Sequence, residues 1–282
     1  MGRDPIPDIP ASLGPCVGLT LLGQGAMGAV FRARHTRLGT DVAVKVVNPR
    51  LGAKDPKLFQ RFLREVELLR GVDDPHVVRF LDAGQEGAFT FAVMELVVGR
   101  TLGQLKADSP GGVMAPDAAA FYLAQVARGL DAVHRRGIIH RDLKPDNVMV
   151  DAAGRARIMD FGLARGRQSN QLTMLDEVVG TPEYMAPETI QHHEVDGRAD
   201  LYSLGVSAYE LLTGATPFNQ GGLLRVVQDH VSRAPIPVEV KNPRVPAALA
   251  QVVARLMAKA PDGRYATAGE AAAALAPLAC RR

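Results

Sequence analysis

Hydrophobic and polar positions follow two different periods along the chain, and the period changes near residue 100. From Val17 to about Asn48 the sequence is rich in β-branched residues interrupted by glycines, which predicts strands. Over residues 55–70 apolar residues recur three and four positions apart, which predicts an amphipathic helix. Two more strand-like runs follow at Val77–Leu81 and Phe89–Leu96. The first third of the chain is therefore expected to be β-rich with one main helix.

The remainder of the chain is mostly helical in pattern. A long helix is predicted over Pro116–Arg135, where the proline occupies a favourable early position. Residues 138–160 mix loop with short strands, and residues 161–197 show little periodicity. Further helices are predicted at Arg198–Thr213, Leu223–Ser232, Ala247–Ala258 and Ala268–Leu275. The pattern predicts an α+β fold with an irregular leader at 1–15, a β-rich part at 16–97 and a helical part at 98–282.

Composition narrows the class of protein. With 282 residues and 47% hydrophobic residues the chain can bury a sizeable core. Its net charge of +3 is spread over scattered lysines and arginines, which favours a solvated surface over a nucleic-acid interface. Cys16 and Cys280 have no metal-ligand spacing, which fits a reducing compartment. No hydrophobic signal region and no apolar run of about 18 residues occurs, so we expect a cytoplasmic protein with no membrane segment in this chain.

A glycine-rich element is the first candidate for chemistry. Gly23, Gly25 and Gly28 form a GxGxxG pattern that ends in Val30. Glycines let backbone N–H groups approach phosphate oxygens without interference from a Cβ atom. A dinucleotide-binding turn would open a helix, whereas Val30-Phe31-Arg32 is strand-like, which argues against a dinucleotide-dependent oxidoreductase. A hairpin folded over a nucleotide fits better, and an ordinary hairpin stays open as an alternative.

A lysine within an apolar strand is the second candidate. Lys45 ends the run Val42-Ala43-Val44-Lys45, where burial is costly unless an anion pairs with the ammonium group. Glu65 on the following amphipathic helix is a suitable partner and would hold Lys45 toward nucleotide phosphates. The alternative is a strand lysine whose end group reaches solvent.

The most specific motifs lie in the second half of the chain, and they resemble the protein kinase superfamily. They occur in the family order, and the resemblance covers about residues 17–277. The phrase Asp200-Leu201-Tyr202-Ser203-Leu204-Gly205 is most similar to bacterial eukaryotic-like Ser/Thr kinases. The motifs are His140-Arg141-Asp142-Leu143-Lys144-Pro145-Asp146-Asn147, Asp160-Phe161-Gly162 and Ala186-Pro187-Glu188.

The resemblance implies a bilobal protein kinase fold and a non-specific serine/threonine protein kinase that uses ATP and Mg²⁺, with Mn²⁺ as a possible substitute. Asp142 would orient the substrate hydroxyl and accept its proton, and Lys144 would neutralise the γ-phosphate. Lys45 and Glu65 complete the implied catalytic set. Asn147 and Asp160 are the implied metal ligands, since they supply the oxygen atoms that Mg²⁺ prefers.

The resemblance also implies an adenine site and a structural frame. Met94 would lie at the back of the adenine pocket, and backbone groups of Glu95 and Val97 would bond the base. The implied nucleotide-binding residues are Gly23, Gly25, Gly28, Val30, Ala43, Lys45, Met94, Glu95, Val97 and Met149. The implied supports are an anchor from Asp200 to the catalytic loop, an Arg264–Glu188 pair, and a stack of Leu69, Phe80, Phe161 and His140.

Regulation and specificity are implied by the segment before Glu188. In the family, lysine at position 144 together with Thr181 marks serine/threonine specificity, and Thr181 would position substrate. Arg141 before Asp142 implies control by phosphorylation of the activation segment, and Thr173 matches a known acceptor position. Autophosphorylation between two copies would need transient self-association, and the other partners would be proteins with serine or threonine acceptors.

Two alternatives differ in activity. A pseudokinase that only binds or scaffolds usually lacks Lys45, Asp142 or Asp160, and this chain has all three. A small-molecule kinase of the antibiotic- or choline-phosphorylating type shares a related catalytic loop but lacks the segment Gly180–Glu188.

Overall fold

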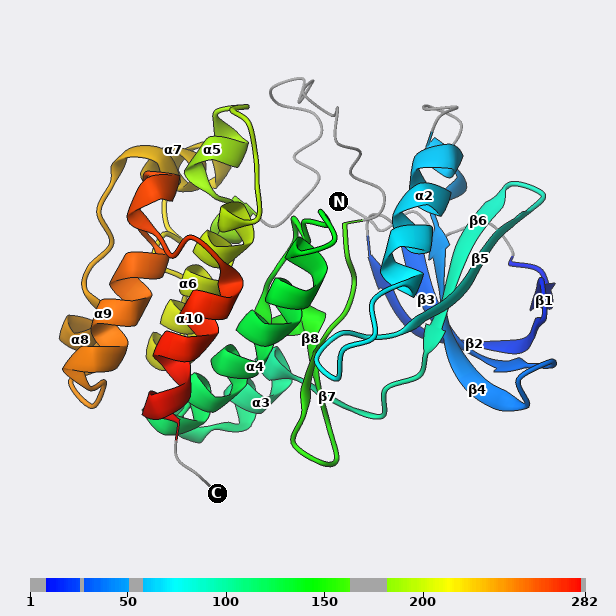
Figure 1. The fold of residues 1–282 in the computed structure, drawn as a ribbon, viewed down its shortest axis with the longest axis horizontal. Helices are drawn as coiled ribbons and strands as arrows, with labels where there is room; N and C mark the ends of the chain where they lie inside the picture. Colours follow the sequence, from blue (N-terminus) through cyan, green and yellow to red (C-terminus); the bar gives the residue numbers. More distant parts are fainter. Residues whose placement is uncertain (1–8, 26–27, 51–57, 163–181, 280–282) are drawn as a thin grey trace. The chain divides into compact units, whose positions relative to one another are not determined.

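The computed structural model describes residues 9–25, 28–50, 58–162 and 182–279 and divides the chain into two compact units. The described residues of the first unit lie within 9–73 and 78–98, and those of the second within 74–77, 99–162 and 182–279. Figure 1 shows the strands β1–β6 with the helix α2 in the first unit, and the helices α3–α10 in the second.

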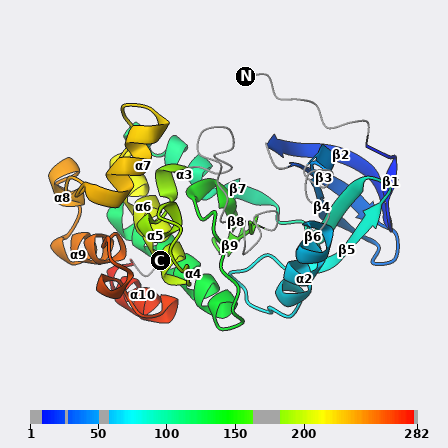
Figure 2. The ribbon, with the colours of Figure 1, turned by 90° about the horizontal axis from the view of Figure 1, so that it is seen from above.

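The first unit is built on a six-stranded antiparallel sheet (Figure 2). The helix α2 (Leu58–Arg70) packs against β5, and the predicted strands between Val17 and Asn48 are confirmed. The predicted helix at 55–70 is confirmed from Leu58 onward, since residues 51–57 lie outside the described part. In sheet order the strands are β1 (Ser12–Leu13), β2 (Cys16–Gly25), β3 (Gly28–His35), β4 (Thr40–Val47), β6 (Phe89–Glu95) and β5 (Phe80–Glu86).

Alternation along β4 separates the core of this unit from the side that carries Lys45. Val42, Val44 and Val46 are fully buried in a hydrophobic cluster with residues of β1, β2, β3 and β6. Successive side chains of a strand point to opposite faces of the sheet. Ala43 and Lys45 therefore lie on the face of β4 opposite to this cluster.

The strand predicted at Val77–Leu81 is placed wrongly. The structure begins β5 at Phe80 and continues it through polar residues to Glu86, paired with β6. Val77 and Val78 are buried outside any strand, and Val77 forms an isolated parallel bridge to Ile158. The apolar run marks burial, whereas strand pairing continues where the side chains are partly exposed.

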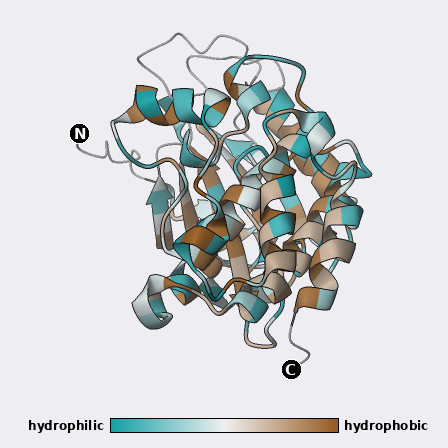
Figure 3. Ribbon diagram, turned by 90° about the vertical axis from the view of Figure 1, so that its left-hand side faces the viewer, coloured by the Kyte–Doolittle hydropathy of each residue, from teal (hydrophilic) through white to brown (hydrophobic). Residues whose placement is uncertain are grey.

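Two helices form the centre of the second unit. α4 (Pro116–His134) and α6 (Arg198–Thr213) are in contact and bury most of their residues. At Gly205 a Cβ atom would lie 2.8 Å from the Leu256 side chain, so glycine permits the close approach of α6 and α9. Figure 3, which faces the side of the second unit, shows hydrophilic and hydrophobic stretches along single helices, as expected where one side of a helix is buried. The other helices are α3 (Leu102–Asp108), α5 (Pro187–Ile190), α7 (Leu223–Ser232), α8 (Val238–Lys241), α9 (Ala247–Leu256) and α10 (Ala268–Leu275), with 3₁₀ turns at Pro110–Gly112, Pro145–Asn147, Pro182–Tyr184, Pro261–Gly263 and Ala276–Leu278.

A small sheet in the second unit holds the loops that carry the candidate chemistry. Its order is β7 (Gly99–Thr101), β8 (Val148–Asp151) and β9 (Ala156–Ile158). The loop 140–147 leads into β8, and the Asp160 motif follows β9. Buried Gln125 on α4 accepts a hydrogen bond of 3.0 Å from the Ala156 N–H, which ties the β8–β9 hairpin to the central helix.

Within the described ranges, no helix has both the length and the apolar character needed to cross a membrane.

Candidate active site

The glycine-rich element forms the hairpin between β2 and β3. Gly23 pairs with Val30 and Gly25 with Gly28, while residues 26–27 lie outside the described part. Gly28 has a φ of 154°, and a Cβ atom there would lie 2.0 Å from the Val46 carbonyl oxygen. Only glycine allows β4 to run this close to the hairpin. The sequence predicts a strand after Gly28, in contrast to the helix that follows a dinucleotide-binding turn, and β3 confirms this prediction.

Four predicted nucleotide-binding residues share one face of the sheet. Val30 is directly opposite Lys45, and Ala43 is directly opposite Met94. Opposite residues of an antiparallel pair have their side chains on the same face. That face is the one opposite to the hydrophobic cluster, and Lys45 is half-buried on it. The ammonium group of Lys45 can therefore contact an anionic ligand on this face of the sheet, away from the hydrophobic cluster.

Glu65 lies on α2 in the same unit as Lys45. It is half-buried, and the buried residues Phe62 and Val66 flank it on the side of the helix that packs inward. The helical spacing that predicted this face is confirmed. The structure therefore places Glu65 at the margin of the packed face of α2, where a carboxylate can meet a partner on the sheet.

Some backbone hydrogen-bonding groups directly after Met94 are already bonded within the protein. The Glu95 N–H donates to the Arg79 carbonyl at 3.0 Å, and Glu95 Oε1 accepts from the Arg79 N–H at 2.8 Å. A bound base could therefore not use the Glu95 N–H and would need its carbonyl oxygen. Val97 follows outside any helix or strand and is half-buried. Met149 belongs to the second unit, on β8.

Asp200 fixes the backbone of the loop 140–147 in the second unit. Its Oδ2 accepts the His140 N–H at 2.8 Å, and its Oδ1 accepts the Arg141 N–H at 2.9 Å. Burial raises the pKa of Asp200, but hydrogen bonds and charge interactions with His134 and His140 together hold that pKa below the ordinary value. Asp200 is thus an ionised carboxylate at the first turn of α6, where the helix dipole favours it. The predicted anchor is confirmed.

His140 is a buried structural centre of the same loop. Its Nε2 donates to the Met159 carbonyl at 2.9 Å, and its Nδ1 accepts the Asp142 N–H at 3.3 Å. Burial lowers the pKa of His140, so the ring is neutral. The ring packs on Phe161 with centroids 4.7 Å apart. Of the predicted four-residue stack this pair is confirmed; Leu69 and Phe80 are buried in the first unit.

Three predicted catalytic and metal-binding residues meet within this loop. Asn147 Nδ2 donates to the Asp142 carbonyl at 2.7 Å and to Asp142 Oδ2 at 3.2 Å. Lys144 Nζ lies 3.9 Å from Asp142 Oδ2. The Asp142 side chain keeps 21% of its surface exposed, so it can reach a second molecule. A fixed, partly exposed carboxylate beside an ammonium group suits the handling of a hydroxyl and an anion.

The donor set for a divalent cation is chemically suitable. The Met159 N–H donates to the Asn147 carbonyl at 2.9 Å. Asp160, which has a φ of 58°, directly follows Met159 and so comes one residue after this contact with Asn147. Asn147 uses its Nδ2 toward Asp142, which leaves Oδ1 as the atom for a metal. No group of three or more His, Cys, Asp or Glu residues that could hold a metal occurs in the part that the structure covers. One carboxylate and one amide oxygen fit Mg²⁺ when phosphate oxygens complete its shell.

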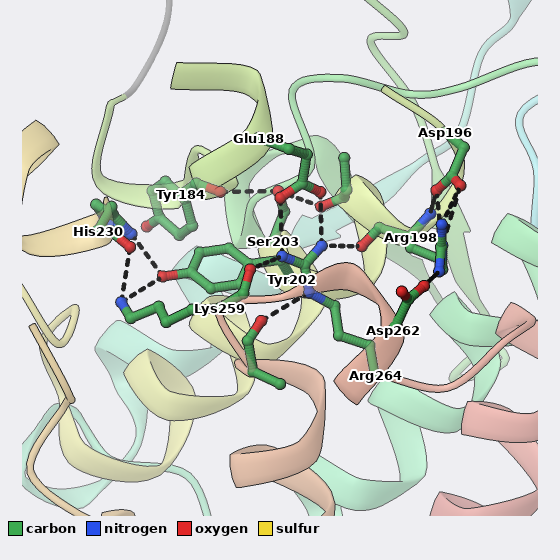
Figure 4. Close-up of polar contacts among 12 residues, drawn as sticks. Tyr184, Glu188, Asp196, Arg198, Tyr202, Ser203, His230, Lys259, Asp262 and Arg264 are labelled. Carbon is green, nitrogen blue, oxygen red and sulfur yellow. Dashed lines mark hydrogen bonds and ion pairs between the residues drawn. The ribbon is translucent and has the colours of Figure 1, made fainter. Parts of the chain in front are cut away.

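A buried ion pair fastens α5 to the stretch between α9 and α10 (Figure 4). Arg264 donates to Glu188 through Nη1 at 2.6 Å and through Nη2 at 2.8 Å. The side chains are 0% and 6% exposed, and the predicted pair is confirmed. Thr173 and Thr181 lie outside the described residues.

Polar contacts that the sequence did not indicate hold Tyr184, which lies three residues before α5. Tyr184 donates to Glu210 at 2.5 Å, and Lys106 donates to the other oxygen of Glu210 at 2.6 Å. Ser203 Oγ donates to the Tyr184 carbonyl at 2.8 Å. These partners stand 19 to 104 residues apart, so no local spacing could have found them.

A second missed network lies beside it (Figure 4). The Tyr202 hydroxyl is 2.9 Å from His230 Nδ1, and Lys259 Nζ donates to the His230 carbonyl at 2.7 Å and to the Tyr202 hydroxyl at 3.3 Å. Burial lowers the pKa of Lys259 to about 8 and that of His230 to about 4. The network joins α6, α7 and the loop after α9.

Comparisons with known proteins agree with this architecture. A family profile described as "Protein kinase domain" matches residues 17–274. The serine/threonine-protein kinase PknB of Mycobacterium tuberculosis is 39% identical over 256 residues, which cover 89% of this chain and 40% of PknB. The serine/threonine-protein kinase Pkn1 of Myxococcus xanthus is 41% identical over 251 residues, which cover 87% of this chain and 36% of Pkn1. The chain thus spans about two fifths of these relatives.

A crystal structure of the PknI kinase domain from Mycobacterium tuberculosis has the same fold. It superposes with a TM-score of 0.77 at 29% sequence identity, and the match covers 95% of this chain and 96% of that one.

Proposed function

The chain belongs to the protein kinase family, on the branch of bacterial serine/threonine-protein kinases, and from this we propose that it transfers the γ-phosphate of ATP to serine and threonine hydroxyls of proteins. The observation that carries the proposal is the loop that joins Asp142, Lys144 and Asn147 and is fixed by buried Asp200. A scaffold that only binds a partner would not need this arrangement.

Asp142 is proposed to position the acceptor hydroxyl. The substrate oxygen forms a bond to the γ-phosphorus while the bond from that phosphorus to the bridging oxygen of ADP breaks, and the hydroxyl proton passes to the carboxylate. A carboxylate is a weak base toward the proton of an alcohol, so orientation of the hydroxyl is its larger contribution. The hydrogen bond from Asn147 to Asp142 keeps the carboxylate in one orientation.

The two lysines are proposed to balance phosphate charge from different units. Lys144 would lie against the transferred group, which bears negative charge in the transition state. Lys45 would contact the α- and β-phosphates, held in place by Glu65. The backbone N–H groups around Gly23, Gly25 and Gly28 would cover the phosphates.

Asn147 and Asp160 are proposed to hold Mg²⁺, with Mn²⁺ as a substitute. A bound cation would supply positive charge that stabilises the negative charge developing on the transferred phosphoryl group. For the base, Val30, Ala43, Met94 and Met149 would enclose the ring, and the carbonyl of Glu95 and the backbone of Val97 would hydrogen-bond it. These assignments follow the family motifs position by position.

The test of this function is phosphate incorporation from Mg²⁺-ATP into a generic basic protein. We expect Asp142→Asn to lower the rate by about 10²-fold or more, since it removes the carboxylate that accepts the proton. ATP binding, measured by calorimetry, should be retained because Asp142 is not in the nucleotide set. Binding of ATP without any transfer by the wild-type chain would instead support the pseudokinase alternative.

Activation by autophosphorylation is a further part of the proposal. Arg141 lies beside Asp142 and would pair with a phosphate on the activation segment, with Thr173 as the acceptor. Leu175, Asp176 and Glu177 follow, so we propose one acceptor where related kinases often have two. Site mapping by mass spectrometry after incubation with ATP should find phosphate on Thr173; phosphate on Ser169 with Thr173 bare would contradict it. Transfer between two copies would make the rate depend on enzyme concentration.

The remaining assignments are also proposals. We assign residues 1–15 to a leader, 16–97 to the N-terminal lobe and 98–282 to the C-terminal lobe of one kinase domain. Thr181 would contact Asp142 and Lys144 and so favour serine and threonine over tyrosine. Reaction in the cytoplasm follows from the supply of ATP there, and the partners would be proteins with serine or threonine acceptors.

A further inference from the structure

A buried hydrogen bond links the end of α4 to Asp200, the residue that fixes the loop 140–147. His134 is the last residue of α4, and its Nε2 lies 2.8 Å from Asp200 Oδ2. The side chains of His134 and Asp200 are 15% and 1% exposed. Because an ionised carboxylate only accepts, Nε2 of His134 must carry the proton and donate it.

The same carboxylate oxygen serves the catalytic loop. Asp200 Oδ2 accepts from His134 and from the His140 N–H, and Oδ1 accepts from the Arg141 N–H. Arg141 has a φ of 64°, a left-handed conformation that a residue with a side chain adopts only when its surroundings enforce it. Rotation of the Asp200 carboxylate would release both N–H groups directly before Asp142.

Gly197 provides the space that the His134 ring needs. A Cβ atom at Gly197 would lie 2.7 Å from His134 Nδ1 and 2.9 Å from its Cε1. Gly197 immediately precedes α6, three residues before Asp200, and its φ of −59° is open to any residue. The glycine is therefore explained by the ring against it and not by the backbone.

We propose that His134 is a positioning residue for phosphoryl transfer, which acts by holding Asp200 in the orientation that fixes His140 and Arg141, with Gly197 keeping the ring in place. The inference rests on the proposed kinase activity. His134 is not one of the proposed nucleotide- or acceptor-binding residues, so we expect its effect to fall on the rate of transfer and to leave the binding of ATP unchanged.

The first test separates kcat from KM. We expect His134→Ala to lower kcat about tenfold or more, the range of a lost hydrogen bond to a charged group, with KM for ATP changed less than about twofold. His134→Gln should recover most of kcat, because a glutamine amide nitrogen can reach the position of Nε2. His193→Ala, on an exposed histidine, is the matched control and should equal wild type.

Substitution of Gly197 provides a second, independent test of the proposal. Gly197→Ala alone should lower kcat as His134→Ala does, because the new Cβ displaces the ring. In the His134→Ala background the same change should have no further effect, since the ring is gone. Additive losses would overturn the proposal, as would a His134→Gln variant as slow as His134→Ala.

A measurement without turnover distinguishes failure of this inference from failure of the kinase assignment. Hydrogen exchange of the His140 and Arg141 amides should be about tenfold faster in His134→Ala, while amides of α10 exchange as in wild type. Faster exchange in both regions, with activity lost in proportion to unfolded protein, would show a purely structural role and overturn the proposal. If the wild type transfers no phosphate but the two amides respond as stated, the kinase assignment fails and the coupling of His134 to the loop stands.

Discussion

At the scale of single residues, Arg264 uses every one of its side-chain hydrogen-bond donors. A guanidinium has five N–H donors, and each has an acceptor here. Two go to the Glu188 carboxylate, and the other three go to carbonyl oxygens. The carbonyls are those of Ala258, Arg198 and Lys259. The planar fork of arginine matches this set, and the three donors of a lysine do not.

We predict that Arg264→Met lowers the free energy of unfolding by about 3–5 kcal/mol, because Glu188 is left buried without its partner. Arg264→Lys should fall between this variant and wild type, since it keeps the charge and loses the paired geometry. Urea unfolding followed by circular dichroism measures both. A midpoint for Arg264→Lys equal to wild type would contradict the geometric argument.

The matched control is the ion pair between Arg198 and Asp262. Asp262 is 94% exposed, and pairs in solvent contribute about 0–1 kcal/mol. Asp262→Asn should therefore shift the urea midpoint much less than Arg264→Lys.

The sequence predicted site residues that stand in contiguous motifs, and it missed their distant partners. Asp142, Lys144 and Asn147 could be assigned because loop chemistry fixes their spacing. The contact between His134 and Asp200 spans 66 positions and joins the end of one helix to the start of another. Such pairs depend on how helices pack, which no local pattern encodes.

At the scale of elements, hydrophobic spacing predicted the longer helices well. The bounds of α6, α7 and α10 agree with the predicted ranges, and α9 ends two residues before Ala258. Spacing failed at β5, where buried valines precede the strand. It also failed for α3 and α8, which are too short to show a period.

The missed helix α3 does have a signal in the sequence. Thr101 at its N-cap accepts the Gln104 N–H at 3.1 Å, and the Gln104 side chain accepts the Thr101 N–H at 2.9 Å. This reciprocal capping box is a threonine followed three positions later by glutamine. This pair in the sequence predicts a helix that starts at Leu102.

We predict that Thr101→Ala destabilises the protein by about 1 kcal/mol, since it leaves an N–H at the start of α3 without its acceptor. Thr101→Ser keeps the hydroxyl and should stay within a few tenths of wild type. Thermal unfolding of the three proteins measures the difference. Equal midpoints for the alanine and wild-type proteins would mean that packing alone determines α3.

At the scale of the whole molecule, each unit has its own apolar interior, and the second unit also buries two neutral imidazoles. His140 is fully buried within the loop 140–147, and His230 is a buried residue of α7 whose Nδ1 lies 2.9 Å from the hydroxyl of Tyr202 on α6. Burial lowers the pKa of both rings below the ordinary value of 6.5. Folding is therefore linked to proton release in mildly acidic solution.

The sign of this linkage gives the last prediction. The pKa of His230 is lowered from 6.5 to about 4, so between these values the unfolded chain binds a proton that the folded chain does not. The stabilising effect is complete above pH 6.5 and is lost as the pH falls toward 4, with a slope of about 1.4 kcal/mol per pH unit for each such proton. His230→Gln should lower stability at pH 7 yet flatten the slope between pH 4 and 6.5. The exposed His192→Gln should leave it unchanged. Urea midpoints at half-unit steps of pH measure all three proteins, and a full slope in His230→Gln would assign the acid sensitivity to other groups.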